Sequence, residues 1–250
     1  MPNATCIFAR VERKYLLTPR QYEGLMRVLD EYMRRDVYGE STILSLYLDT
    51  PDSLLIRRSI EKPAYKEKLR LRSYGVPVDG DEVFLEIKKK VQGVVYKRRV
   101  CMTLADAMDC LSRGDVPDGN GQIGREAAYM LRRYGLRPAA LLACDRTAYA
   151  ELEPSPDCLR VTFDRGIRGR ATELDLRLGD AGAPLLAPGM RLMEIKTARA
   201  IPLWLCAALD RNGIRPTSFS KYGRIYEARM RAEPAYVEMK GAFSHAVCHI

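Results

Sequence analysis

The sequence lacks the residues and loops on which several common kinds of active site depend. Its only two histidines, His245 and His249, lie within the last six residues, which excludes a Ser-His-Asp triad or a histidine-rich metal site in the body of the chain. There is no GxxxxGK[ST] loop, and the GxGxxG of residues 119–124 follows a predicted helix, whereas a dinucleotide-binding turn would follow a strand. The chain is therefore neither a P-loop protein nor a Rossmann-type nucleotide binder.

Long apolar runs and paired cysteines are also missing. No stretch approaches the roughly 18 apolar residues of a membrane span, and the N-terminus has no apolar core of a signal peptide. We therefore expect a cytoplasmic protein with no membrane segment of its own. The seven cysteines form no CxxC pair, so neither a zinc framework nor a disulfide scaffold is indicated. We expect them to be buried small side chains in a reducing compartment.

Positive charge is present in excess. Over 250 residues, 41 Lys and Arg stand against 32 Asp and Glu, a formal net charge of +9. This excess predicts an anionic partner: nucleic acid, a membrane surface or a phosphorylated small molecule. Aromatic residues make up only 8% of the chain, and Tyr129, Tyr134 and Tyr149 do not alternate with the basic segments as base-stacking side chains would. Nucleic acid is therefore not the expected partner.

Period-two alternation, which is typical of strands, dominates the chain. It predicts strands over residues 5–17, 42–49, 64–74, 82–91, 94–103, 139–150, 159–164 and 191–197. A helix is predicted after Thr18, with Pro19 in its first turn, and further helices near 104–112, 122–135, 202–212 and 220–230. We expect one strand-dominated α+β domain over residues 1–230, followed by a tail over residues 231–250.

The charged residues of these strands share a face. Residues i and i+2 of a strand point the same way and lie about 7 Å apart. The series are Arg10, Glu12 and Lys14; Lys66, Lys68, Arg70 and Arg72; Glu86, Lys88 and Lys90; Lys97 and Arg99; Arg160, Thr162 and Asp164; and Glu194 and Lys196. A solvated sheet face is the ordinary alternative, but like charges repel across strands. If the sheet closes into a barrel, a polyanion is the natural occupant of its basic lumen.

These residue types suit phosphoryl transfer, which depends on positioning and on charge neutralisation by Lys, Arg and a divalent metal. Arg binds phosphate oxygens in bidentate fashion, and Lys supplies a point charge. Carboxylates among such cations could hold Mg²⁺ or Mn²⁺, which prefer oxygen ligands. Glu12, Glu86 and Glu194 fit that description, and internal salt bridges with neighbouring lysines are the alternative for each of them.

Nine motifs follow one another between residues 7 and 228. They are RVERKY (10–15), LYLDT (46–50), KLRLRSYG (68–75), FLEIKKK (84–90), YKRRV (96–100), DRTAY (145–149), LRVTFDRGIRG (159–169), LMEIKT (192–197) and SFSKYGRIY (218–226). Together they resemble the VTC domain in its bacterial, single-domain form. The VTC domain is the polyphosphate polymerase branch of the triphosphate tunnel metalloenzyme (CYTH-like) superfamily.

The resemblance implies an antiparallel eight-stranded tunnel barrel with helices packed outside. It also implies a phosphotransferase in which the terminal phosphate of polyphosphate attacks the γ-phosphate of ATP, with help from Mn²⁺ or Mg²⁺. Carried over by position, the resemblance assigns central roles to Lys14, Arg70, Arg72 and Lys88, phosphate binding to Lys97, Arg146, Arg160, Ser220 and Lys221, and the metal to Glu194. Facing the same lumen, Lys196 is a further phosphate-binding candidate, and Glu86 and Glu12 are further metal candidates.

The chain departs from the hydrolytic branch of the superfamily, whose first strand carries ExExK. Here Arg10 stands at the first acidic position, which favours the polymerase over a two-metal hydrolase. A metal-dependent triphosphatase and a non-catalytic polyphosphate-binding module stay open as alternatives. Eukaryotic VTC proteins carry a phosphate-sensing module and membrane helices, and this chain has neither. We therefore expect it to act on ATP and polyphosphate, alone or with a separate membrane partner.

Overall fold

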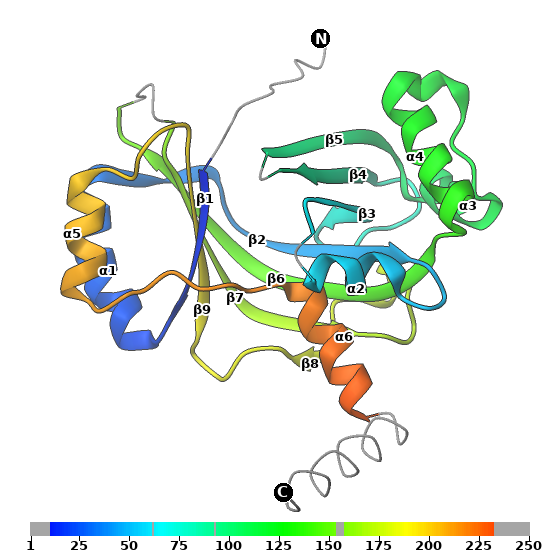
Figure 1. Ribbon diagram of the computed structural model, residues 1–250. Helices are drawn as coiled ribbons and strands as arrows, with labels where there is room; N and C mark the ends of the chain where they lie inside the picture. Colours follow the sequence, from blue (N-terminus) through cyan, green and yellow to red (C-terminus); the bar gives the residue numbers. More distant parts are fainter. Residues whose placement is uncertain (1–10, 62, 93, 154–157, 233–250) are drawn as a thin grey trace, which may run out of the picture.

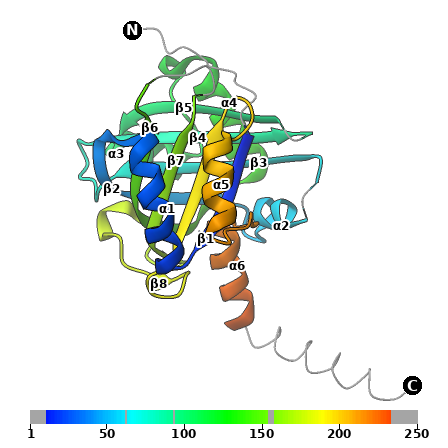
Figure 2. The same cartoon turned by 90° about the vertical axis from the view of Figure 1, so that its left-hand side faces the viewer.

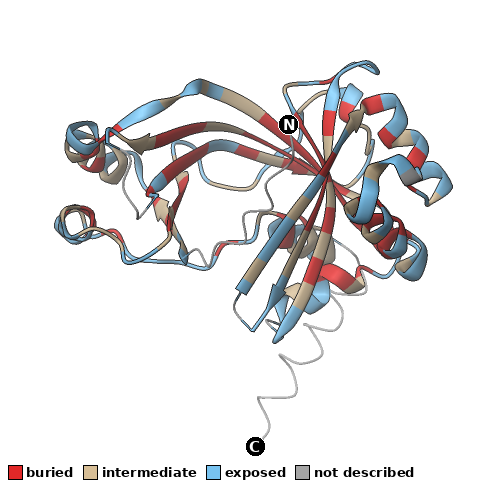
Figure 3. Ribbon diagram, turned by 90° about the horizontal axis from the view of Figure 1, so that it is seen from above, coloured by how far each residue is buried: buried red, intermediate tan, exposed pale blue. Residues whose placement is uncertain are grey.

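One antiparallel sheet organises the chain in the computed structural model, which describes residues 11–61, 63–92, 94–153 and 158–232 (Figure 1). Its strands are β1 (Val11–Leu17), β2 (Met33–Asp49), β3 (Tyr65–Tyr74), β4 (Glu82–Val91), β5 (Val94–Thr103), β6 (Arg137–Glu151), β7 (Arg160–Arg170), β8 (Ala183–Pro184) and β9 (Arg191–Thr197). They follow the order β1-β9-β7-β6-β2-β3-β4-β5, with β8 paired to β7. The long strands β2 and β6 join two halves, β1-β9-β7 and β3-β4-β5, whose strands run in different directions (Figure 3).

The sheet is open, so the predicted closed barrel is wrong. The strand order ends at β1 on one side and at β5 on the other, and the described residues of these two strands do not pair with each other. Residues 216–217, which precede the last described helix, occupy part of the free edge of β1. The Thr217 amide donates to the Lys14 carbonyl at 2.7 Å, and Tyr15 forms a bridge with Pro216. These backbone groups of β1 are therefore already engaged and cannot pair with β5.

Helices cover the outer faces of both halves (Figures 1 and 2). On the β1-β9-β7 half, α1 (Pro19–Tyr32) and α5 (Leu203–Arg211) enclose a core that includes Leu25, Phe163 and Ile195. On the β3-β4-β5 half, α3 (Leu104–Arg113) and α4 (Gly121–Tyr134) enclose a second core around Leu69 and Ile87. Two short 3-10 turns span Asp118–Asn120 and Leu176–Leu178. The outer faces are therefore apolar and covered, which leaves the other face of the sheet for charged residues.

A third apolar cluster lies on the inner face, where α2 (Leu54–Ile60) and α6 (Lys221–Ala232) pack against the sheet. Tyr47 of this cluster pairs in register with Arg70, so the cluster shares its face with basic side chains. The Tyr222 hydroxyl anchors α6 by donating to the Asp49 carboxylate at 2.9 Å. Asp49 also accepts from backbone amides at the start of α2. These contacts place the first turn of α6, which begins with Lys221, beside the basic strands.

Most predicted elements are confirmed, several of them to the residue. The strands predicted over 82–91, 94–103 and 191–197 coincide with β4, β5 and β9. The helix predicted after Thr18 is α1, and its capping box with Gln21 is formed. β2 and β7 extend beyond their predicted limits, and β2 has an irregular register between Arg35 and Glu40, where alternation breaks down. α2 was not predicted, because seven residues are too few to show a helical period.

The cysteine expectation is confirmed only in part. Cys110 and Cys144 are buried, but Cys101, Cys158 and Cys206 are exposed, because they occupy a strand end, a loop and the outer side of α5. None of the helices in the described part of the chain is long and apolar enough to cross a membrane. Arg10 and residues 233–250 of the predicted tail lie outside the described residues.

Candidate functional site

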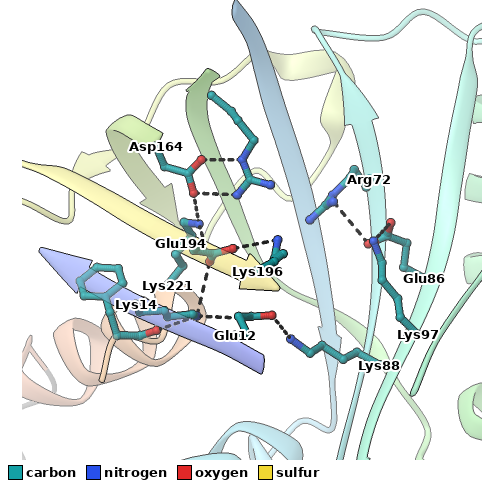
Figure 4. A network of polar contacts seen from close by, with 12 residues as sticks. Glu12, Lys14, Arg72, Glu86, Lys88, Lys97, Asp164, Glu194, Lys196 and Lys221 are labelled. Atoms are coloured by element: carbon teal, nitrogen blue, oxygen red, sulfur yellow. Dashed lines mark hydrogen bonds and ion pairs between the residues drawn. The ribbon is translucent and has the colours of Figure 1, made fainter. Parts of the chain in front are cut away.

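The basic residues of both halves face each other across the inner side of the sheet, which we call the charged face (Figure 4). Lys88 of β4 lies 3.8 Å from Glu12 of β1, although five strands separate them in the sheet order. The sheet is therefore strongly curved, and the charged face is concave. Residues directly opposite on neighbouring strands share this face. The rows are Glu12, Lys196 and Arg160; Lys14, Glu194 and Thr162; Tyr47, Arg70, Glu86 and Arg99; and Lys68, Lys88 and Lys97.

Glu194 is the central carboxylate of the β1-β9-β7 half. Its buried side chain lies 3.2 Å from Lys196 Nζ, 3.5 Å from Lys14 Nζ and 3.8 Å from Lys221 Nζ. Burial alone would raise the pKa of Glu194, but Lys221, Lys196 and Lys14 hold it well below its ordinary value. Lys14 is fixed in turn by donating to the Phe219 carbonyl at 3.1 Å. Glu194 is therefore ionised at neutral pH, and three lysines from three different elements surround it.

Asp164 of β7 holds two further cations in place. Arg146 of β6 donates to both of its carboxylate oxygens, at 2.6 and 2.8 Å, and Lys221 of α6 also contacts it. Burial would raise the pKa of Asp164, but Lys221 and Arg146 lower it to about 2. Arg146 and Lys221 are therefore pre-positioned by a buried carboxylate.

Glu86 plays the corresponding part in the β3-β4-β5 half. It lies 2.7 Å from Arg70, 2.9 Å from Lys97 and 3.7 Å from Arg72, and only 1% of its side chain is exposed. Burial would raise the pKa of Glu86, but Arg70, Arg72 and Lys97 lower it to about 2. Arg70 and Arg72 lie at its Oε2, and Lys97 lies at Oε1, which is buried and makes no hydrogen bond. Glu86 is therefore suited to orienting these cations, and the metal role predicted for it stays a prediction.

Three lysines stand directly opposite one another on β3, β4 and β5: Lys68, Lys88 and Lys97. Burial lowers the pKa of Lys68 to about 8, and Lys88 and Lys14 act in the same direction. Burial likewise lowers the pKa of Lys97 to about 8. No carboxylate within the described ranges forms an ion pair with Lys68, and the one ion-pair partner of Lys88 there is Glu12, at 3.8 Å. Lys68 and Lys88 are thus little compensated by carboxylates, whereas Lys97 pairs with Glu86 at 2.9 Å.

Two predicted phosphate-binding residues lie at the rim and have other contacts. Arg160 pairs with Asp36 at 2.5 Å, and 45% of its side chain is exposed. The exposed Ser220 precedes α6, and its hydroxyl accepts from the Gly223 amide at 3.1 Å. Arg160 would have to release Asp36 to bind a ligand fully, and Ser220 contributes to the start of α6.

The charged face offers carboxylate and hydroxyl oxygens to a divalent metal. No three acidic, histidine or cysteine side chains of the described residues gather into a ready-made metal cluster. Mg²⁺ commonly takes one or two carboxylates and completes its shell with phosphate oxygens and water, and Glu194 fits that pattern. Thr162, opposite Glu194, has a buried hydroxyl with no hydrogen-bond partner. The partly exposed Glu12 adds a carboxylate that also pairs with Lys14. The oxygen donors therefore fit a metal that arrives with a phosphate chain.

Sequence reasoning did not assign site roles to Asp164, Tyr47 or Lys68. Asp164 and Lys68 stood in alternating series, so a signal was present, but the pairing of Asp164 with Arg146 and Lys221 depends on the tertiary structure. The Tyr47 hydroxyl accepts from Arg70 at 3.1 Å. Burial would raise the pKa of Tyr47, but Arg70 and Lys68 lead the cations that lower it to about 8. No pattern in the sequence distinguishes this tyrosine from an ordinary core residue.

Comparisons with known proteins give one family. The model of the VTC domain matches residues 9–229, whereas a comparison with curated proteins gives no match. Similar solved structures include a candidate adenylate cyclase from Vibrio parahaemolyticus, with 12% identity and a TM-score of 0.49, covering 88% of this chain and 98% of that one. Another is a candidate adenylyl cyclase from Hippeastrum described as having a dominant triphosphatase activity, with 14% identity, a TM-score of 0.49 and coverage of 88% and 96%. Similarity at this level carries no argument about the activity of this chain.

Proposed function

The chain thus belongs to the VTC domain family, and from this premise we propose that it transfers the γ-phosphate of ATP to a growing polyphosphate chain on the charged face. Family membership supports the broader statement that it is an enzyme acting on phosphate chains. The observation that carries the proposal is the row of Lys68, Lys88 and Lys97 beside Arg70 and Arg72. Like charges opposite one another on neighbouring strands are destabilising, and a phosphate chain supplies the negative charge that this row lacks.

The triphosphate binds to the β3-β4-β5 half in this proposal. Arg70 and Arg72 project from the strand that carries Lys68, and Glu86 holds their guanidinium groups together with the Lys97 ammonium. Arginine donors in a fixed orientation bind phosphate oxygens in bidentate fashion. Because Glu86 orients these groups before the ligand arrives, little reorganisation is needed during the reaction.

The metal belongs to the opposite half. Glu194 would hold Mn²⁺ or Mg²⁺, with Glu12 and the Thr162 hydroxyl as further oxygen donors. When bound there, the metal would neutralise charge on the reacting phosphate oxygens. Lys14, Lys196 and Lys221 surround Glu194, so a metal is electrostatically favoured only in the company of phosphates that balance these cations. We therefore expect metal and triphosphate to bind together.

The chemical step forms one bond and breaks another. A terminal oxygen of the polyphosphate forms a bond to the γ-phosphorus of ATP, while the bond between that phosphorus and the β,γ-bridging oxygen breaks and ADP leaves with the electron pair. The attacking phosphate is already ionised at neutral pH, so no histidine base is required. Lys88, which lies between the two halves, is well placed to stabilise the charge that shifts during transfer.

Incubation with ATP and Mn²⁺ followed by sizing of the products tests the proposal. A polymerase produces long phosphate chains and ADP. A triphosphatase, in which water replaces the phosphate acceptor, releases single phosphate or pyrophosphate and no chain. A binding module turns over neither substrate, and its affinity for polyphosphate survives both removal of the metal and the Glu194→Gln substitution. Absence of phosphate chains among the products would contradict polymerisation.

A further inference from the structure

Tyr74, Phe84 and Arg99 form an aromatic cluster at one end of the basic rows. The Tyr74 and Phe84 rings lie 5.9 Å apart, nearly edge to face, and the Arg99 guanidinium carbon lies 4.5 Å from the Phe84 ring centre. Phe84 stands directly opposite Arg72, and Arg99 stands opposite Glu86. The cluster therefore belongs to the charged face and adjoins the cations that would bind the triphosphate.

The cluster is accessible and is not filled by the fold. Tyr74 is 53% exposed. Arg99 is exposed as well, and no carboxylate in the described part of the chain forms an ion pair with it, because Glu86 is engaged by other cations. One side of Arg99 rests on Phe84, so its other side is open to a planar group. A half-exposed tyrosine and a guanidinium form a surface on which a base can stack.

Spacing relates this surface to the phosphate site. Tyr74 is two residues beyond Arg72 on β3, hence about 7 Å away on the same face. That separation is comparable to the reach of a ribose between an α-phosphate and its base. In the other direction the strand carries Lys68 and Lys66, so the phosphate tail would extend along the lysines. The two ends of the face thus differ, with aromatic groups at one end and lysines at the other.

We propose that Tyr74, Phe84 and Arg99 form a nucleobase subsite that orients a nucleoside triphosphate along β3 and β4. The base stacks on this cluster, the α-phosphate lies near Arg72, and the γ-phosphate points toward Lys88. The inference rests on the proposed function, since it assumes that a nucleoside triphosphate is the phosphate donor. Stacking is tolerant of base identity, so ATP and GTP bind with similar affinity.

The test compares ATP with inorganic triphosphate, which carries the phosphates without a base. Calorimetry at fixed ionic strength gives the ratio of the two affinities for the parent protein, for Tyr74→Ala and for Arg99→Lys. The second substitution keeps the charge but removes the planar guanidinium. We expect the preference for ATP over inorganic triphosphate to fall about tenfold in both variants. Melting temperatures verify that the variants are folded.

A matched control is Tyr129→Ala on α4. Tyr129 is 57% exposed and has Arg133 at 6.0 Å from its ring centre, so it resembles Tyr74 but lies away from the charged face. The preference of the Tyr129→Ala variant for ATP over inorganic triphosphate should equal that of the parent. An unchanged ratio in Tyr74→Ala and Arg99→Lys, with both ligands still bound, overturns the subsite and leaves the proposed function standing. If the parent binds neither ligand, the proposed function fails and the subsite fails with it.

Discussion

Lys88 occupies the place where the two halves of the charged face meet. Its contact with Glu12 joins the two halves at 3.8 Å, and 43% of its side chain is exposed. The side chain therefore contributes little to the core but lies within reach of a bound phosphate chain. Among the residues predicted from sequence, it combines accessibility with a central position most clearly.

Substituting Lys88 by alanine should reduce turnover by at least about two orders of magnitude, the effect of removing a group that stabilises transition-state charge. The melting temperature should change little, because the side chain is not part of the core. Steady-state kinetics and thermal melting measure the two effects. Arg113→Ala is a matched control, since Arg113 is an exposed cation on α3 whose ion-pair partner among the described residues is Asp109. Near-normal turnover in the Lys88 variant would remove Lys88 from the site.

Glu194→Gln keeps the shape of the side chain but removes the charge that a hard cation requires. We expect a steep loss of activity that added metal only partly restores. Binding of ATP without metal should be unchanged or tighter, because a negative charge leaves a site for an anion. Metal titrations of turnover provide the measurement. Coincident titration curves for the variant and the parent would show that Glu194 is not a ligand.

Lys68 should make triphosphate binding depend on pH. Its pKa is lowered by burial to about 8, so triphosphate affinity should fall as the pH rises through 8 and the ammonium loses its charge. The stability of the fold should change with pH in the opposite direction. A lysine with a lowered pKa carries its proton less readily in the fold than in the unfolded chain, so the unfolding free energy of the ligand-free protein should rise between about pH 8 and 10.5.

Calorimetry and thermal melting across this range test both statements about Lys68. Lys68→Arg is the control, since arginine keeps its charge throughout. The variant should retain part of the triphosphate affinity that the parent loses above pH 8, and the remaining loss belongs to Lys97, whose pKa burial also lowers to about 8. If affinity in the parent is flat through pH 8, Lys68 is either fully charged there or away from the ligand.

At the scale of elements, α6 contributes Lys221 to the charged face although the helix lies outside the sheet. Tyr222 follows Lys221 directly, stacks on Tyr47 with ring centres 4.8 Å apart and donates to the buried Asp49. Tyr47 in turn accepts from Arg70. These contacts form a continuous path from the start of α2 to both halves of the charged face. The position of Lys221 therefore depends on how firmly this helix is anchored.

Tyr222→Phe removes the hydroxyl and leaves the ring in place. A hydrogen bond to a charged acceptor is worth about 1.5–3 kcal/mol, so the melting temperature should fall by several degrees. Turnover should fall less than in Lys221→Ala, because Lys221 is displaced and not lost. Tyr226→Phe, on the same helix, is the control, since no hydrogen bond of its hydroxyl is found among the described residues. Equal melting temperatures for both phenylalanine variants would contradict the anchoring role.

At the scale of the whole molecule, the two halves of the charged face differ in charge. The β1-β9-β7 half and its neighbours interleave lysines with Glu12, Asp164 and Glu194. On the charged face, the described residues of the β3-β4-β5 half set one buried carboxylate, Glu86, against their cations. These cations include Lys68, Arg70, Arg72, Lys88, Lys90, Lys97 and Arg99. One triphosphate cannot neutralise so many charges. A longer anion is therefore favoured as the ligand of the β3-β4-β5 half.

Affinity should therefore rise with phosphate chain length, from pyrophosphate through triphosphate to longer chains, because each added phosphate gains a charge-assisted contact. Salt should weaken the longer ligands more, since more contacts are screened, and polyphosphate should raise the melting temperature by linkage. Calorimetry at fixed ionic strength measures the series. A plateau at triphosphate would contradict polymer binding and favour a triphosphatase.

Much of the site could be predicted from sequence because its main signal is local. Alternation along a strand places Lys68, Arg70 and Arg72 on one face whatever the rest of the chain does. The same signal located Glu86 and Glu194 among cations. It could not distinguish a metal ligand from a carboxylate enclosed by arginines, because that difference depends on side chains from neighbouring strands. In the structure, Glu86 lies within ion-pair distance of Arg70, Arg72 and Lys97.

The sequence by itself determined the strands, the sign of their charge and the side on which that charge lies, since each follows from a period of two residues. The tertiary structure decided which strands are neighbours and whether the sheet closes. Closure failed because backbone groups of β1 bond with the segment before α6, a contact between residues some two hundred positions apart. The pairing of Asp164 with Arg146 and Lys221 arose in the same way. Such contacts depend on how distant segments pack, and no local pattern in the chain encodes them.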